Sequence, residues 1–240
     1  PRISAMKRLE SAVLRVVCPP LLLAAVLAVG APAHAMTSTF TTGDEGWTTD
    51  FNGDEPVAWN DVGFIDVHDK TNDWAYLKAP ASFLAPIAAG GSFRFDLRHE
   101  AGEGEGRNYG VRVALSGAGT TLIAELDPPT DVWTTYVFPL TEGAGWRSFG
   151  STQQDYHAGA PPADLALLNT VLGDLSGVYI ATDYTNGNRG NDRIDRTFID
   201  NVQLLAAPVP EPDTWHMLLA GAAMLAGVLK VDGRRGARQR

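Results

Sequence analysis

The chain has 240 residues, of which 45% are hydrophobic and 20% charged, and this ordinary globular composition excludes a disordered chain. Its formal net charge is −9, and the acidic excess is concentrated between residues 36 and 208 because many of the basic residues lie near the two ends. Such a surface repels phosphate backbones, so we expect no nucleic-acid partner. The single cysteine, Cys18, lies near the N-terminus, so the rest of the chain must fold without a disulfide.

The first 35 residues have the layout of an export signal. A basic flank precedes the apolar stretch 16–29, and Ala33 and Ala35 form a small-x-small cleavage site around His34. This order of basic, apolar and small residues is typical of a leader that passes through the Sec translocon and is then removed. The basic residues of the flank are Lys7, Arg8 and Arg15.

We therefore predict a signal peptide over residues 1–35, with Met6 as the true start and Met36 as the first residue of the exported protein. The alternative is a first transmembrane helix. Pro19-Pro20 and Gly30 shorten any helix here to less than the ~20 residues that a bilayer requires, which disfavours that alternative.

Residues 36–207 form the folding unit. Short runs rich in β-branched and aromatic residues alternate there with Gly-, Asn- and Pro-rich turns, and the run 93–98 alternates apolar and polar residues as a half-buried strand does. Leucine and valine spacing over 164–175, behind a possible Asp164 cap, predicts one short helix. The fold class is therefore all-β, an antiparallel β-sandwich of about eight strands. The expected strands are 63–68, 74–77, 93–98, 109–115, 121–126, 133–139, 177–182 and 196–204.

Motifs spread over this unit resemble the laminin B domain, also called laminin domain IV, which is a galactose-binding-like jelly roll. One departure is Ala85-Pro86, where the family usually has Gly and a polar residue. The resemblance implies a jelly roll over residues 36–207. The matching pieces are Gly46-Trp47 and residues 74–84, 90–95, 171–175, 179–182 and 198–204.

Relatives of this jelly roll often bind a structural calcium ion where the first and last strands pair. Asp44 and Glu45 near the start of the domain and Asp200 near its end are hard oxygen ligands of the kind calcium prefers. The resemblance thus implies a calcium site made by these three residues. The alternative is that Asp200 and Asn201 only form hydrogen bonds within a turn.

Aromatic residues in the expected loops are the candidates for sugar binding, because aromatic rings stack on the faces of sugars and galactose-binding-like folds often bind glycans. These candidates are Trp59, Trp146, Tyr156 and Tyr184. Three other tryptophans flank strands, so we expect them in the core: Trp47, Trp74 and Trp133.

No catalytic signature occurs in the sequence: there is no Gly-x-Ser-x-Gly elbow, no His-Glu-x-x-His and no phosphate-binding glycine loop. His99-Glu100 could be half a metal site, but we expect it to face solvent at a strand end. Glu103 and Glu105 lie in a glycine-rich loop that cannot hold two carboxylates at a fixed separation. We therefore expect a protein that is not an enzyme.

Residues 208–240 have three parts: Pro210-Glu211-Pro212, an apolar stretch over 215–229, and a basic end. The apolar stretch can enter a membrane but barely cross it, and the arginines keep the terminus on the cytoplasmic side. This tail resembles the PEP-CTERM sorting signal, which implies cleavage near Pro210, Glu211 and Pro212 by the membrane protease-transpeptidase exosortase. The alternative is an uncut C-terminal anchor.

These features together predict an exported, non-catalytic protein of a Gram-negative bacterium. It would be anchored transiently in the inner membrane by its tail, sorted by exosortase, and retained at the cell surface or in the extracellular matrix. Extracellular polysaccharide is the expected partner of its jelly-roll domain. The alternatives are a structural or adhesion protein without a specific ligand and, less favoured, a glycan-active enzyme.

Overall fold

The computed structural model describes residues 35–50, 56–68, 75–101, 109–152, 156–185 and 195–207. The predicted leader before Ala35, Trp74 and the tail with Pro210, Glu211 and Pro212 lie outside these described residues. Within them, the chain forms twelve strands, one α-helix and one 3-10 helix.

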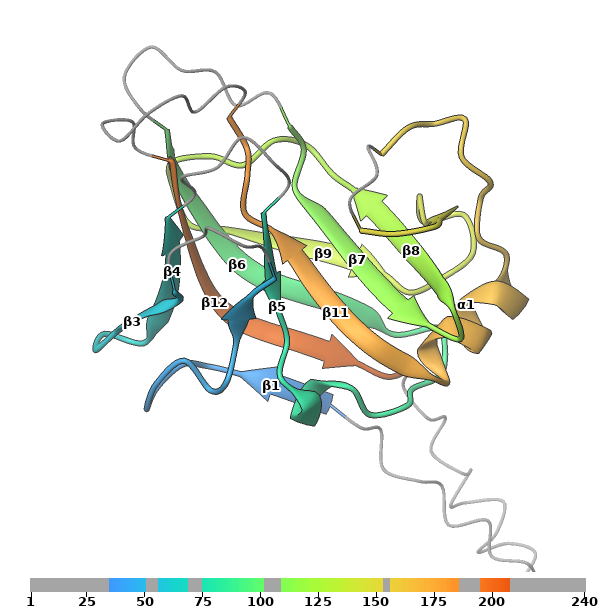
Figure 1. The fold of residues 1–240 in the computed structure, drawn as a ribbon, viewed down its shortest axis with the longest axis horizontal. Helices are drawn as coiled ribbons and strands as arrows, with labels where there is room; N and C mark the ends of the chain where they lie inside the picture. Colours follow the sequence, from blue (N-terminus) through green and yellow to red (C-terminus); the bar gives the residue numbers. More distant parts are fainter. Residues whose placement is uncertain are drawn as a thin grey trace, which may run out of the picture. The chain divides into compact units, whose positions relative to one another are not determined.

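The strands form two six-stranded antiparallel sheets that pack face to face (Figure 1). We name each sheet after a central strand. The β6 sheet has the order β3 (Ala58–Asn60), β4 (Phe64–His68), β12 (Asp195–Leu205), β6 (Ser92–Ala101) and β9 (Thr134–Pro139), and β1 (Ala35–Ser38) also pairs with β12. The β7 sheet has the order β10 (Arg147–Phe149), β8 (Thr120–Glu125), β7 (Arg112–Gly117), β11 (Leu175–Ala181), β5 (Tyr76–Lys78) and β2 (Thr48–Thr49).

The core lies between the two sheets, and the period-2 alternation of the strands fills it. In β6, Phe93, Phe95 and Leu97 are buried while the residues between them are at least partly open. Val113 and Leu115 of β7 belong to the same hydrophobic cluster. Burial of this apolar surface on one face of each sheet stabilises the domain without any disulfide.

The single described α-helix, α1 (Leu165–Leu172), begins as the sequence predicts. The Asp164 carboxylate accepts a hydrogen bond from the Leu167 backbone N–H at 2.8 Å, which satisfies one of the free donors of the first turn. Leu168, Val171 and Leu172 are buried, and the helix contacts β7 and β8. No helix within the described ranges has the length and apolar character needed to span a bilayer.

All eight expected strands are present in the structure, and the fold class is confirmed as an antiparallel jelly-roll sandwich with one helix. The first and last strands pair, as expected, because β1 runs antiparallel to β12 with Met36 opposite Leu204. The strands that the sequence missed, β1, β2, β3 and β10, have two to four residues each. So few residues show no clear alternation, and their pairing is set by the longer neighbouring strands.

A β-bulge interrupts β12 between Asp200 and Gln203, where its register against β6 shifts. On its other side, β12 pairs with β4 as far as Ile199 and with β1 from Val202 onward. Asn201 adopts a left-handed conformation with φ of 50° at this point. The bulge therefore lies where β12 exchanges one neighbouring strand for another.

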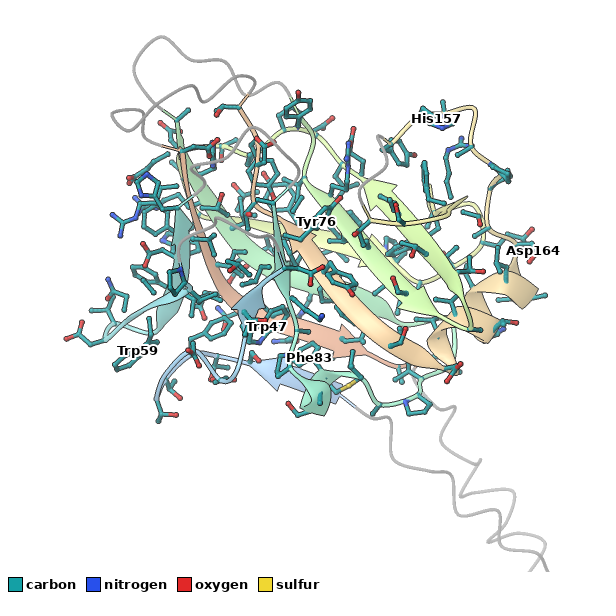
Figure 2. All side chains as sticks on the ribbon, viewed as in Figure 1. Trp47, Trp59, Tyr76, Phe83, His157 and Asp164 are labelled. Atoms are coloured by element: carbon teal, nitrogen blue, oxygen red, sulfur yellow. The ribbon has the colours of Figure 1, made fainter. Side chains whose placement is uncertain are left out.

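The two described tryptophans that were expected in the core differ in burial. Trp47 is 1% exposed, donates through Nε1 to Ser38 Oγ at 2.9 Å, and packs edge-on against Phe83 with ring centroids 5.2 Å apart (Figure 2). Trp133 is 43% exposed, so its core assignment is wrong. It precedes β9 in phase with the exposed Thr135 and Val137, which places it on the outer face of the sheet.

We expect Trp47→Ala to lower the free energy of unfolding by about 3–5 kcal/mol, because a large buried ring leaves a cavity. Trp133→Ala should cost about 1 kcal/mol or less, since much of its ring is already in water. Urea denaturation followed by circular dichroism measures both changes. An equal loss of unfolding free energy in the two variants would contradict the placement of Trp47 in the core and of Trp133 on the outer face.

Candidate functional site

The outer face of the β6 sheet carries three rows of side chains in matched register. Outward residues of β12, β6 and β9, together with Trp133 just before β9, form three rungs across the sheet. We number the rungs from the start of β9. Rung 1 is Phe198, Arg98 and Trp133, rung 2 is Asp200 with Asp96 and Thr135, and rung 3 is Gln203, Arg94 and Val137.

Rung 1 is an aromatic surface fixed by a guanidinium group. The Arg98 guanidinium carbon lies 4.1 Å from the ring centroid of Phe198 and 5.9 Å from that of Trp133. Phe64 of β4 packs edge-on against both rings, with its centroid 5.6 Å from that of Trp133 and 5.7 Å from that of Phe198. These contacts hold Trp133 in place while leaving part of its surface open to solvent.

Rung 2 is a hydrogen-bonded polar group centred on Asp96. The Thr135 hydroxyl donates to Asp96 Oδ1 at 2.5 Å, and the Asn201 side-chain amide donates to Asp96 Oδ2 at 2.8 Å. The same amide lies 3.2 Å from Asp200 Oδ2. The bulge thus brings Asn201 between two carboxylates from neighbouring strands.

Rung 3 completes a pocket. Arg94 donates through Nε to Gln203 Oε1 at 2.9 Å, which leaves its terminal N–H groups for other acceptors. Opposite it, Val137 is an exposed apolar side chain. Asp96 and Thr135 of rung 2 and Arg94 and Gln203 of rung 3 help to line a pocket of about 320 Å³. This volume is near the lower end of the roughly 300–1,000 Å³ typical of ligand sites. Its lining residues are Arg94, Phe95, Asp96, Thr135, Asn201 and Gln203.

Asp200 of rung 2 lies beside the pocket, next to the lining residue Asn201. Partial burial raises the pKa of its carboxyl group above the ordinary value of 3.8. The Asn201 backbone N–H, which donates to Asp200 Oδ1 at 2.6 Å, opposes that rise, whereas the nearby Asp96 and Glu45 carboxylates add to it. Asp200 is therefore easier to protonate than an ordinary carboxyl group.

The opposite outer face, that of the β7 sheet, is partly covered by its own chain. Phe149 and Ala160 pack over Ala114 and Ile123 in a second hydrophobic cluster, and Tyr156 and Tyr179 lie against it. The Tyr156 hydroxyl donates to the Gly145 carbonyl at 3.2 Å. The exposed Trp133 and the polar pocket therefore both lie on the outer face of the β6 sheet, which the described residues do not cover in this way.

The structure separates the four residues expected to bind sugar. Trp59 is 42% exposed on β3, where its Nε1 donates to the Phe40 carbonyl at 2.6 Å (Figure 2). Tyr156 is partly buried in a loop that packs against the outer face of the β7 sheet. Trp146 is 2% exposed and donates to the Pro139 carbonyl at 2.7 Å, and Tyr184 is wholly buried. The expectation that Trp146 and Tyr184 lie on exposed loops is wrong, because both rings anchor their loops in the core.

The predicted calcium ligands do not assemble into one set. The Asp44 carboxylate accepts the Gly46 backbone N–H at 2.9 Å, and Glu45 accepts that of Phe40 at 2.6 Å. Within the described ranges, no group of three or more His, Cys, Asp or Glu side chains is placed to hold a metal ion. Asp200 and Asn201 form the local hydrogen bonds of the alternative interpretation. Calcium binding by Asp44, Glu45 and Asp200 stays a prediction.

His99 was expected to face solvent, and this is wrong. It is wholly buried in β6, with Nδ1 3.1 Å from Thr197 Oγ1 and Nε2 3.5 Å from Asp195 Oδ1. Its ring packs edge-on against Tyr184 with centroids 5.1 Å apart. The alternation that buries Leu97 continues to His99 and places it inside the sandwich.

We expect Asp200→Asn to raise the melting temperature near neutral pH, because it removes a partly buried charge beside Asp96 and Glu45. A raised pKa means that folding favours the protonated carboxyl group, so this stabilisation is present at low pH and is lost as pH rises through the folded-state pKa. The gain from the variant should therefore disappear below about pH 3.8. Thermal melts in EDTA from pH 3 to 8 measure it.

Repeating these melts in millimolar calcium tests the metal prediction. If calcium binds at Asp200, calcium raises the melting temperature of the unchanged chain, and Asp200→Asn removes that rise. Identical melting curves with calcium and with EDTA would contradict the calcium site.

Solved structures with a related fold were found for this chain. The L4b domain of human laminin alpha-2 is 16% identical, with a TM-score of 0.54 over 73% of this chain and 98% of that domain, which shows a shared fold. The agarase AgWH50C is 15% identical over 74% of this chain and 25% of the agarase, with a TM-score of 0.45. The N-terminal cellulose-binding domain of Cellulomonas fimi beta-1,4-glucanase C is 15% identical over 71% of this chain and 95% of that domain, with a TM-score of 0.35. The last two scores are too low to support an argument.

Among curated protein sequences, nothing matches this chain. The family comparison is decisive, because the model of Laminin B (Domain IV) matches residues 76–214, which is more than half of the chain. The matched span includes most of the motifs that carried the resemblance, together with the departure at Ala85-Pro86. The chain therefore belongs to the laminin B (domain IV) family.

Proposed function

We propose that this chain is an exported, non-catalytic surface protein that binds polysaccharide on the outer face of its β6 sheet. The observation that carries the proposal is the exposed Trp133 ring, held by Arg98 next to a pocket lined by hydroxyl, carboxylate, amide and guanidinium groups. The proposal moves the expected sugar site from the loop aromatics to a sheet face.

Sugars match this mixture of groups. A pyranose ring presents C–H groups on its faces, which stack on an aromatic ring, and hydroxyl groups at its rim, which form hydrogen bonds. Trp133 offers the stacking surface, while Arg94 and Asp96 offer a donor and an acceptor in fixed positions. Because both side chains are already held by neighbours, little side-chain entropy is lost when a ligand binds.

A neutral polysaccharide fits this face better than an anionic one. Two of its three arginines already pair with carboxylates: Arg98 with Glu100 at 3.1 Å and Arg196 with Asp66 at 2.6 Å. The rest of the domain is acidic and repels polyanions. Arg94 is then the main donor left for the hydroxyl groups of a neutral chain.

Binding is favoured over hydrolysis by the state of the carboxylates. Both oxygens of Asp96 accept hydrogen bonds, from Thr135 and Asn201, so Asp96 serves as a fixed acceptor. A glycosidase instead needs one carboxyl group that delivers a proton and a second that attacks or activates water. Asn201 ties Asp96 to Asp200 and occupies the space between them.

The location follows from the two ends of the chain. The leader over residues 1–35 supports export through the Sec translocon, and the Pro210-Glu211-Pro212 tail supports sorting by exosortase to the cell surface or extracellular matrix. Membership of the laminin B family agrees with an extracellular domain. Exopolysaccharide is then the partner that the domain meets. A structural matrix protein without a ligand is the alternative.

Affinity electrophoresis of the full chain through gels that contain xylan, hydroxyethylcellulose, agarose or alginate tests binding. We expect retardation by at least one neutral polymer and none by alginate, and we expect Trp133→Ala to abolish it. Trp59→Ala is the matched control, because Trp59 has nearly the same exposed fraction but lies on β3. Unchanged mobility in every gel would favour the structural alternative, and loss of retardation only in Trp59→Ala would move the site to β3.

Processing is tested by intact-mass measurement on protein from the native host. We expect a mass that begins at Met36 and lacks the segment after the Pro210-Glu211-Pro212 site. Replacing these three residues with alanines should leave the tail attached and the protein in the membrane fraction. A mature protein that still contains Arg234 and Arg235 would rule out cleavage by exosortase.

A further inference from the structure

We infer that the β6-sheet face binds a linear chain of at least two consecutive sugar residues, lying along β6 and β9 in one direction, with one residue stacked on Trp133 and the next in the pocket of rungs 2 and 3. This inference rests on the proposed polysaccharide binding. It adds the size and direction of the ligand, which the proposed function leaves open.

The rungs are too far apart for a single sugar ring to contact all of them. Neighbouring rungs are two residues apart along β6, from Arg98 to Asp96 to Arg94. Because a strand rises about 3.4 Å per residue, each step is about 7 Å and the three rungs span about 14 Å. One sugar ring cannot touch Trp133 and Arg94 together, whereas consecutive rings of a chain can.

The two ends of the face differ in their chemistry. Rung 1 offers an aromatic surface and a guanidinium already paired with Glu100, so it suits stacking. Rungs 2 and 3 offer the Asp96 carboxylate and the terminal N–H groups of Arg94 around a pocket, so they suit a ring held by its hydroxyl groups. A chain contacts both kinds of group, and a monosaccharide contacts one.

The face is also asymmetric and rigid. Rung 1, with Trp133, lies at the start of β9, and rung 3, with Arg94, lies toward its end. A sugar chain reversed end for end would therefore not present the same groups to the two rungs. The hydrogen bonds from Thr135 and Asn201 fix Asp96, and the contact between Arg98 and Phe198 fixes rung 1. Both subsites therefore keep their spacing when the ligand is absent.

Isothermal titration calorimetry of the full chain tests the inference with cello-, xylo- and agaro-oligosaccharides of one to six residues. We expect no measurable binding of monosaccharides and a gain of roughly tenfold or more in affinity for each residue that fills a new subsite, with a plateau once the rungs are covered. Trp133→Ala should remove the gain from one subsite and Arg94→Met the gain from the other. Trp59→Ala should leave the whole series unchanged.

Three outcomes are possible, and each has one meaning. The inference is supported if affinity rises with oligosaccharide length and if Trp133→Ala and Arg94→Met each remove part of that rise. A monosaccharide that binds as tightly as the hexasaccharide, or length dependence that ignores Trp133, overturns the inference while polysaccharide binding stands. No heat with any oligosaccharide, together with no retardation by any polymer, overturns both. Melting temperatures of the variants near that of the unchanged chain confirm that each is folded.

Discussion

The pairing of β12 is the constraint on which the rest of this molecule depends. β12 pairs with β6 on both sides of its bulge, while its other side pairs first with β4 and then with β1. The exchange of neighbours takes place at the Asp200-Asn201 bulge, where Asn201 takes up a left-handed conformation and turns its amide toward Asp96. A straight strand could not place that amide between two carboxylates. The bulge therefore closes the sandwich with the first strand and also shapes the pocket on its outer face.

The two faces of the β6 sheet have opposite roles that follow from strand geometry. Inward side chains form the core, and this is where His99 also lies. Outward side chains form matched rungs, because antiparallel register places residues from three strands side by side. The chain thereby gains a surface whose groups are fixed by the same ladders that hold the fold. The proposed binding site therefore needs no mobile loop and no disulfide.

The sequence predicted the strands well because most of them are long enough to alternate, as 93–98 does, and it predicted α1 through the Asp164 cap. The same alternation also indicates where His99 and Trp133 lie, against the positions that we expected for them. Continued from Leu97, it places His99 in the core, and extended back from Thr135 it places Trp133 outside. The contact between Asn201 and Asp96 joins residues 105 positions apart and needs the register of two strands, which no local pattern contains. Burial of Trp146 and Tyr184 likewise depends on distant segments.

The most direct test of the account is an NMR titration of the isotope-labelled chain with the longest oligosaccharide that binds. The account predicts that shifts concentrate on the Trp133 indole N–H, the Asn201 side-chain amide and Arg94 Nε, all on the outer face of the β6 sheet. Shifts that instead gather around Tyr156 and Tyr179 would place the binding surface on the β7 sheet and contradict the account.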